Sequence, residues 1–315
     1  MAAARWIGAV LAAAVALAPH ASRAQPSIEA PRALAWEACL SAGPPASRAG
    51  LCDAAVALGG WSGGETGTLR AYQGAAIVEA GDVSAGLVLL NDALALSPDA
   101  PIALLVRGIV RVERGDLEGG VADLTAMLRL VPAHPEAINA RAVAHVRLGR
   151  LPLAVADLTE ALRLTPNHPR LLHNRANALR DSGQAEAAMR DYDRLLRLHP
   201  PSAPALTDRC LARLARGDLD RALSDCEAAV ALAPGEAGVV ENRGLVHLRW
   251  NRPDQAMADF NLALSLRESM PWALYGRGIA RLRRGDAVRG SADIRAARAL
   301  DPKVPDDLAR FGIKP

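Results

Sequence analysis

Apolar and small residues recur along this chain with a period of 34 residues, and this pattern predicts the secondary structure. Each period contains two small residues, then a leucine, and a proline two residues after the leucine. The leucine recurs as Leu96, Leu130, Leu164, Leu198, Leu232, Leu266 and Leu300, and Glu268 is the one position where the proline is replaced. A fixed period of this length is typical of a helical solenoid.

We number the places of a unit from residues 67, 101, 135, 169, 203, 237 and 271, so that seven units occupy residues 67–302. Small residues at places 8 and 20 let two helices approach closely. Glycine at place 15, replaced once by Asn251, suits the left-handed residue that ends a helix. Proline at place 32 stops the second helix. Each unit is therefore predicted to be a helix–turn–helix, and the fold class an all-α α-solenoid.

This order of residue types resembles the tetratricopeptide repeat over most of the chain. The resemblance implies a right-handed superhelix of helix–turn–helix units that binds proteins or peptides on its inner face. The aromatic residue that the family carries at places 11 and 24 is retained only as Tyr192 and Phe260. An N-terminal cysteine pair followed by a Trp-Ser-Gly loop is similar to exported repeat proteins of alphaproteobacteria.

Residues 1–24 are predicted to be a cleavable signal peptide. Arg5 precedes an apolar stretch, Trp6–Ala18, and small residues flank a cut after Ala24. The alternative, a short membrane anchor, is disfavoured because the apolar stretch is too short to span a bilayer comfortably. We therefore expect a periplasmic protein that has no membrane span after cleavage.

Residues 25–66 lie outside the regular repeat and are expected to form an N-terminal helical cap. Two short helices are predicted, one around Cys39 and one around Cys52. In an oxidising compartment these cysteines favour a disulfide, which would stabilise a terminal cap that has a neighbour on one side only. The alternative is a pair of buried free thiols. Residues 303–315 are expected to form a short C-terminal capping helix.

Arginine at place 7 and aspartate at place 23 occur together in six of the seven units. In an antiparallel hairpin that turns near place 15, these two places lie at similar heights and project on the same flank. We therefore expect an ion pair inside each of the six units. The pairs are Arg107–Asp123, Arg141–Asp157, Arg175–Asp191, Arg209–Asp225, Arg243–Asp259 and Arg277–Asp293.

The same hairpin geometry brings Cys210, at place 8, close to Cys226, at place 24. Facing residues of two closely packed helices are within disulfide range. A free cysteine is also a good small core residue. The sequence leaves a disulfide and two free thiols equally open.

The sequence contains no motif that indicates catalysis, a metal or a cofactor. Metalloprotease, serine hydrolase, phosphate-loop and paired Cys-x-x-Cys signatures are missing, and no two histidines are spaced as ligands on one helix. The formal net charge of +3 does not suggest a nucleic-acid-binding protein. We therefore predict that the protein is not an enzyme.

The resemblance implies that places 2, 5, 6, 9, 12 and 13 of each first helix line an inner, concave groove. Amide and arginine side chains there can bind a peptide backbone and its carboxylates. A clamp for a C-terminal carboxylate is disfavoured, because place 5 carries neither lysine nor arginine. Trp272 and Tyr275 are a second candidate anchor, since Trp and Tyr dominate binding hot spots. The candidate groove residues are Asn139, Arg147, Arg170, His173, Asn174, Asn177, Asp181, Trp272 and Tyr275.

Two functions are compatible with such a groove. The favoured one is a non-catalytic scaffold of the bacterial envelope that binds a protein or an extended peptide. The alternative is a polysaccharide-handling module of an envelope export or assembly system.

Overall fold

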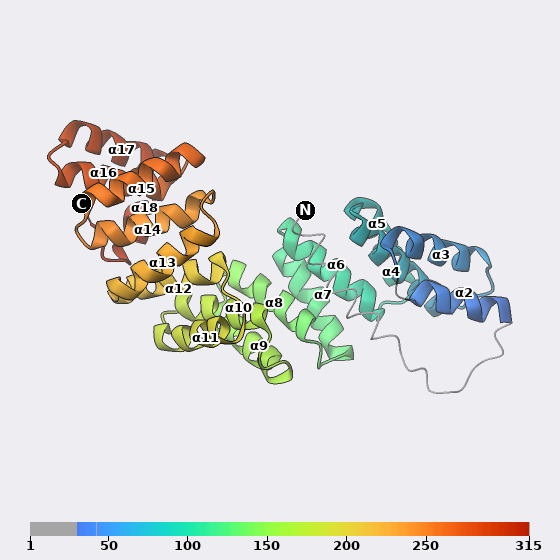
Figure 1. Ribbon diagram of the computed structural model, residues 1–315. Coiled ribbons are helices and arrows are strands. Elements are labelled where there is room, and N and C mark those ends of the chain that lie inside the picture. Colours follow the sequence, from blue (N-terminus) through green and yellow to red (C-terminus); the bar gives the residue numbers. More distant parts are fainter. Residues whose placement is uncertain (1–29, 42, 315) are drawn as a thin grey trace. The chain divides into compact units, whose positions relative to one another are not determined.

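All regular secondary structure in the described part of the chain is α-helical. The computed structural model describes residues 30–41 and 43–314, and the predicted signal peptide lies outside the described residues. Figure 1 shows the helices, α2 to α18. Within these residues, no helix is long and apolar enough to cross a membrane.

Each repeat consists of two helices that follow one another along the chain. The first helices are α4 (Gly63–Ala80), α6 (Pro101–Arg114), α8 (Pro135–Arg147), α10 (Pro169–Asp181), α12 (Ala203–Arg216), α14 (Ala237–Arg249) and α16 (Pro271–Arg283). The second helices are α5 (Val83–Leu96), α7 (Leu117–Leu130), α9 (Leu151–Leu164), α11 (Ala185–Leu198), α13 (Leu219–Leu232), α15 (Pro253–Leu266) and α17 (Ala287–Leu300).

The chain divides into two compact units, unit 1 ending at Pro166 and unit 2 beginning at Asn167. Within each unit the two helices of a repeat pack together, and the second helix also packs on the first helix of the next repeat. First helices contact each other as well, α6 with α8 in unit 1 and α14 with α16 in unit 2. The first helices of a unit therefore form one continuous side of the stack.

The turn between the two helices requires a residue with positive φ. Gly115 ends α6 with a φ of 93°, and Asp116 then accepts a hydrogen bond from the backbone N–H of Gly119 to cap α7. Asn251, which replaces the glycine once, has a φ of 56° and is the one positive-φ residue other than glycine in the described chain. Asparagine tolerates this conformation better than other residues with a Cβ.

Small residues at places 8 and 20 are required by the distance between the helices. A Cβ atom added at Gly108 would lie 2.8 Å from Cγ of Leu124, and one added at Gly120 would lie 2.5 Å from a methyl group of Val112. The aromatic ring of Phe260 fits in the core because Gly244 and Gly276 border it; added Cβ atoms would approach it to 2.8 and 2.4 Å. Helix spacing and side-chain size are thus matched within each repeat.

The N-terminal cap consists of α2 (Ala30–Leu40) and α3 (Pro45–Ala57), which packs on α4. A disulfide joins Cys39 to Cys52, with a Cα–Cα distance of 4.4 Å, and both residues are fully buried. Trp61 donates a hydrogen bond of 2.7 Å from its indole nitrogen to the carbonyl of Ala55. These contacts cover the exposed end of the first repeat.

At the other end, the short helix α18 (Val304–Ala309) packs on α16 and α17. Val304, Leu308 and Ile313 are buried in the core of unit 2. The ring of Phe311 lies edge-on to that of Trp272, with a centroid distance of 5.7 Å. The last residues therefore cover apolar surface that would otherwise face solvent.

All six expected Arg–Asp pairs are in contact. In each pair Nε and Nη2 of arginine donate to the two oxygens of one carboxylate, at distances from 2.6 to 3.0 Å. Five of the aspartates are buried, and Asp157 is half-buried. A bidentate pair with little water around it is among the stronger polar contacts available to a protein.

The remaining amino group of the arginine connects neighbouring repeats. Nη1 of Arg209 donates to Asp193 of the preceding repeat at 2.8 Å, and Nη1 of Arg107 donates to Asn91 at 2.9 Å. Arg141 and Arg277 make the same contact with Thr125 and Asn261. All four acceptors occupy place 25, which the sequence pattern did not single out. One arginine thus joins both helices of its own repeat to the repeat before it.

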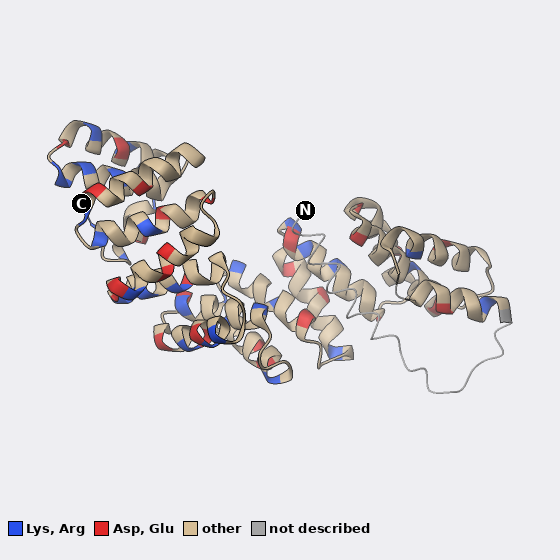
Figure 2. Ribbon diagram, in the orientation of Figure 1, with Lys and Arg blue, Asp and Glu red and all other residues tan. Residues whose placement is uncertain are grey.

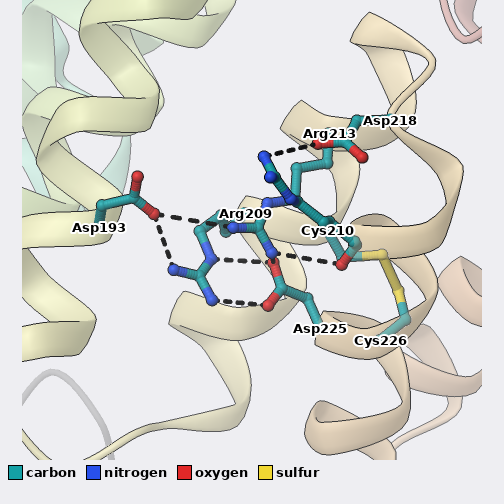
Figure 3. Close-up of polar contacts among 8 residues, drawn as sticks. Asp193, Arg209, Cys210, Arg213, Asp218, Asp225 and Cys226 are labelled. Carbon is teal, nitrogen blue, oxygen red and sulfur yellow. Dashed lines mark hydrogen bonds and ion pairs between the residues drawn. A yellow bond between two sulfur atoms is a disulfide. The ribbon is translucent and has the colours of Figure 1, made fainter.

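The Cys210–Cys226 pair lies directly beside this contact (Figure 3). The two residues form a disulfide with a Cα–Cα distance of 5.6 Å, so the structure resolves the choice that the sequence left open. Asp225 accepts hydrogen bonds from both Arg209 and Arg213. Covalent and ionic links therefore join α12 to α13 at adjacent positions.

Replacing Asp225 with asparagine should destabilise the protein. The Asp225 side chain is only 5% exposed, and its loss of charge leaves the guanidinium groups of Arg209 and Arg213 without their main partner. We expect the free energy of unfolding to fall by about 2–3 kcal/mol, measured as the midpoint of urea unfolding. Asp220→Asn, an exposed aspartate of the same helix, is the matched control and should change it by less than about 0.5 kcal/mol. Equal effects of the two substitutions would contradict a stabilising role for the bridge.

Candidate functional site

Seven of the nine candidate groove residues are at least partly exposed. Arg147, Arg170 and Asp181 are exposed, and His173, Asn174, Asn177 and Trp272 are half-buried. They lie on first helices, as the stripe of places 2, 5, 6, 9, 12 and 13 requires. We call this stripe the first-helix face.

Asn139 and Tyr275 are corrections to the sequence-based set. Asn139 is 3% exposed and Tyr275 is 1% exposed, so neither is accessible to a ligand in this structure. Asn139 is on α8, which packs against α6, α7 and α9. Tyr275 belongs to the core of unit 2, together with the C-terminal residues that pack on α16. We therefore leave both out of the candidate surface.

Arg147 has a structural contact that the sequence did not predict. Its Nη1 donates to the backbone carbonyl of Val112, near the end of α6 in the preceding repeat. Arg283, at the same place of the last repeat, donates in the same way to the carbonyl of Leu248 at 2.6 Å. Carbonyl groups in the last turn of a helix have no partner within it, and arginine supplies one. Arginine at place 13 therefore joins neighbouring repeats, and its presence there does not by itself indicate a ligand.

A polar network occupies the first-helix face where α10 meets α12. Asp208 of α12 accepts hydrogen bonds from three side chains of α10: Nε2 of His173 at 2.7 Å, Nδ2 of Asn177 at 3.2 Å and Nη1 of Arg180 at 2.9 Å. The Asn177 carbonyl oxygen accepts from the hydroxyl of Tyr192 on α11. Asn177, predicted as a groove residue, thus has a structural role as well.

The electrostatics keep Asp208 ionised. Burial alone would raise the pKa of Asp208, but the hydrogen bond from His173 and the charge of Arg180 outweigh it and hold that pKa below its usual value. Burial raises the pKa of the Tyr192 hydroxyl, which remains a neutral donor to Asn177. The network therefore forms a polar wall of the groove in which several hydrogen bonds support one another.

Next to this wall is an open pocket of about 730 Å³, within unit 2. Its lining comes from the start of α12, the loop before α14, the first turns of α14 and the loop before α16. Small and apolar residues form most of this lining. The lining residues are Ala203, Pro204, Thr207, Asp208, Ala233, Gly235, Glu236, Ala237, Gly238, Val239, Asn242, Leu266 and Arg267. We call it the α12–α14 pocket.

A second pocket of about 380 Å³ lies beside it and shares Arg267. Trp272 and Glu241 contribute to its lining, so the predicted anchor Trp272 does face a hollow. Burial raises the pKa of Glu241 to about 7, although the N–H of Ala273 and the charge of Arg267 act in the opposite direction. This carboxyl group therefore titrates near neutral pH.

None of the residues that line the α12–α14 pocket was predicted from the sequence. A signal was present, because place 6 is polar in three successive units as Asn174, Asp208 and Asn242. Extending the groove places from the fourth unit to the fifth and sixth would have identified the last two. In the described part of the chain, no three His, Cys, Asp or Glu side chains are grouped so that they could hold a metal ion.

The charges of the groove belong to a surface of mixed sign. Figure 2 shows acidic and basic residues interspersed along the helices of unit 2. Local contacts, rather than the overall charge of this unit, therefore determine which ligand groups the groove can accept.

Comparison with known proteins identifies the repeat. A family model of the tetratricopeptide repeat matches residues 73–135, 106–169, 173–237 and 207–271, which together cover more than half of the 315 residues. No curated protein is similar enough in sequence to count as a match.

Solved structures share the fold at low sequence identity. The chain is similar to a tetratricopeptide repeat protein from Parabacteroides merdae ATCC 43184, with 19% identity and a TM-score of 0.64 over 79% of this chain and 99% of that one. It is also similar to PilW, a widely conserved type IV pilus biogenesis factor, with 15% identity and a TM-score of 0.59 over 66% and 98%. PilF of Pseudomonas aeruginosa gives 18% identity and a TM-score of 0.56 over 67% and 98%. At these identities the likeness shows the fold alone.

The raised pKa of Glu241 predicts a specific pH dependence. The folded state holds this proton up to about pH 7, whereas an unfolded glutamate loses it near its usual pKa of about 4.3. The native protein should therefore lose stability at this site as the pH rises from about 5 to about 7, and no more above that. Glu241→Gln removes this loss, so the variant should be more stable than the native protein at pH 8, by roughly 2 kcal/mol.

Urea unfolding at pH 5, 6, 7 and 8 measures the difference between the two proteins. Glu236→Gln, at the exposed rim of the neighbouring pocket, is the matched control and should show no such trend. If the free energy of unfolding depends on pH in the same way in Glu241→Gln and in the native protein, the raised pKa of Glu241 is contradicted.

Proposed function

Because the chain belongs to the tetratricopeptide repeat family, we propose that it is a non-catalytic scaffold that binds an extended protein or peptide segment on the first-helix face of unit 2. The segment would lie across α10, α12, α14 and α16. The proposal involves no catalytic step, cofactor or metal ion.

The observation that carries the proposal is the α12–α14 pocket. It is open along the first-helix face, its lining is mostly small and apolar, and two of its polar residues, Asp208 and Asn242, occupy the same place in successive repeats. An extended peptide presents a backbone amide at every residue and side chains on alternate sides. A groove with regularly spaced polar groups and shallow apolar pockets fits such a ligand.

Two features support an envelope location. The first 24 residues have the pattern of a signal peptide. Both cysteine pairs form disulfides, which persist in oxidising compartments such as the bacterial periplasm. Both features support the periplasm as the location of the proposed scaffold.

The chemical class of the partner can be tested directly. The full-length exported protein is immobilised and incubated with three portions of envelope extract: untreated, digested with protease, or oxidised with periodate to destroy polysaccharide. We expect protease to abolish capture and periodate to leave it intact. The reverse result would favour the alternative, a polysaccharide-handling module.

A groove variant then locates the binding surface. Asn174→Ala combined with Asn177→Ala should reduce protease-sensitive capture at least about tenfold, as expected for the loss of one or two hydrogen bonds. The matched control is Arg190→Ala combined with Arg197→Ala, which changes exposed residues of the second helix α11 in the same repeat. Undiminished capture by the groove variant would contradict the assigned surface, provided that circular dichroism shows it to be folded.

A further inference from the structure

Three polar side chains of the α12–α14 pocket have no bonding partner within the described residues. The Asn242 side chain makes no hydrogen bond there, although the residue is only 8% exposed and lines the pocket. The hydroxyl of Thr207, also in the lining, is shielded from water and has no partner. Arg267, in the loop before α16, is exposed and makes no ion pair with the described chain. Buried polar groups are almost always bonded, so Asn242 and Thr207 together indicate a missing ligand, which Arg267 could reach from the edge of the pocket.

The backbone at the start of α14 adds donors to the same pocket. Its N-cap residue, Glu236, makes no side-chain cap, so the N–H groups of Ala237 and Gly238 have no such partner, whereas the N–H of Val239 donates to the carbonyl of Glu236. Gly238 leaves open space: an added Cβ would meet only Nη2 of Arg267, at 3.9 Å. A helix N-terminus favours negative charge. Here it combines with Asn242, one helical turn further on, and with the guanidinium group of Arg267.

The available groups favour an acceptor that carries a single negative charge. Arg267, the Thr207 hydroxyl, the amide nitrogen of Asn242 and the α14 N–H groups are all donors. The carboxylate of Asp208 is already bonded to His173, Asn177 and Arg180, so it remains a fixed negative charge in the wall. With Glu236 at the rim, that charge disfavours a dianion such as phosphate.

The position of Arg267 suggests how a bound chain continues. Arg267 lines both the α12–α14 pocket and the neighbouring pocket, where Trp272 and Glu241 lie. A ligand whose carboxylate is bound at Arg267 therefore has space on two sides. This favours an acidic residue inside a peptide over a carboxylate at its end.

We infer that the α12–α14 pocket binds an acidic side chain of an extended peptide. The carboxylate lies between Arg267 and the start of α14, and the Asn242 carboxamide pairs with the peptide backbone. Small apolar residues of the peptide contact Ala203, Pro204 and Ala237, and the chain continues toward Trp272. This inference rests on the proposed peptide-binding function and specifies its ligand.

Synthetic peptides test the inference on the full-length protein. Three pools of hexapeptides carry fluorescein at the N-terminus and an amide at the C-terminus, with Ala, Val, Leu and Pro at five positions. The fourth position is Glu in one pool, Gln in the second and Lys in the third. Fluorescence polarisation should show the Glu pool binding roughly tenfold more tightly than the Gln pool and more tightly still than the Lys pool. Added salt should weaken only the binding of the Glu pool.

Variants assign the contacts to residues. Arg267→Ala should weaken binding of the Glu pool about tenfold and leave the Gln pool unchanged, because only the ion pair is lost. Asn242→Ala should weaken both pools about equally, because the backbone contact is shared. The matched control is Arg298→Ala, an exposed arginine of α17 in the same unit, which should change neither. The Asn242 side-chain amide, assigned in NMR spectra by its loss in Asn242→Ala, should shift on addition of the Glu pool.

Three outcomes would overturn the inference: equal binding of the Glu and Gln pools, an equal effect of Arg267→Ala on both, or no binding of the Glu pool, whose C-terminus is amidated. Failure here is separable from failure of the proposed function. If envelope proteins are captured through the first-helix face but Arg267 and Asn242 have no effect, the scaffold stands and this ligand assignment does not. If only polysaccharide is captured, the peptide-binding function itself is wrong.

Discussion

The structure depends on one arginine in each of six repeats. Nε and Nη2 of its guanidinium group donate to the aspartate of the same repeat, as in Arg209–Asp225. In four of the repeats Nη1 also donates to place 25 of the preceding repeat, as in Arg209–Asp193. Lysine has a single ammonium group without this planar fork and would not satisfy both partners in the same way. The first repeat has Gln73 at this place, and its neighbour is the N-terminal cap: Gln73 donates to Asp53 of α3.

Close helix packing makes this contact possible. Small residues at places 8 and 20 bring the two helices together, and the distance left between them is then right for a bidentate pair and, in one repeat, for the Cys210–Cys226 disulfide. Where a large ring is kept, as with Phe260, Gly276 in the next repeat provides the space. Loss of either small residue would therefore disturb both the apolar core and the ionic bridge. The first-helix face is positioned by the same contacts, since it is the side on which first helices of neighbouring repeats meet.

Periodic features of this fold could be predicted from the sequence, and local ones could not. The helix–turn–helix unit, the turn at Asn251 and the proximity of Arg209 to Asp225 follow from spacing and helix geometry alone. The packing of the C-terminal helix α18 on α16 is not periodic, and residues of α18 share the core of unit 2 with Tyr275. The role of Arg147 as a donor to the Val112 carbonyl depends on which rotamer a long side chain adopts. Spacing carries no information on that choice.

In the candidate site, too, the periodic residues could be predicted from the sequence and the others could not. Asn242 was not predicted, although it occupies a regular place and the polar residues at place 6 of the two preceding units could have pointed to it. Arg267 and Gly238 do not belong to the repeating pattern, and Arg267 precedes the one unit boundary where Glu268 replaces proline. A ligand site in a repeat protein arises where individual units depart from their consensus, so it must be found from contacts.

The account rests on arginine as a link between repeats, and a double-mutant cycle on Arg209 and Asp193 tests this most directly. The free energy of unfolding is measured for Arg209→Ala, Asp193→Ala, the double variant and the native protein. The account predicts a coupling energy of about 1 kcal/mol between the two residues, even though Asp193 is half-exposed. If the effects of the two single substitutions add to that of the double variant within about 0.3 kcal/mol, the link between repeats is contradicted. The stacking of the repeats would then have to be attributed to apolar packing alone.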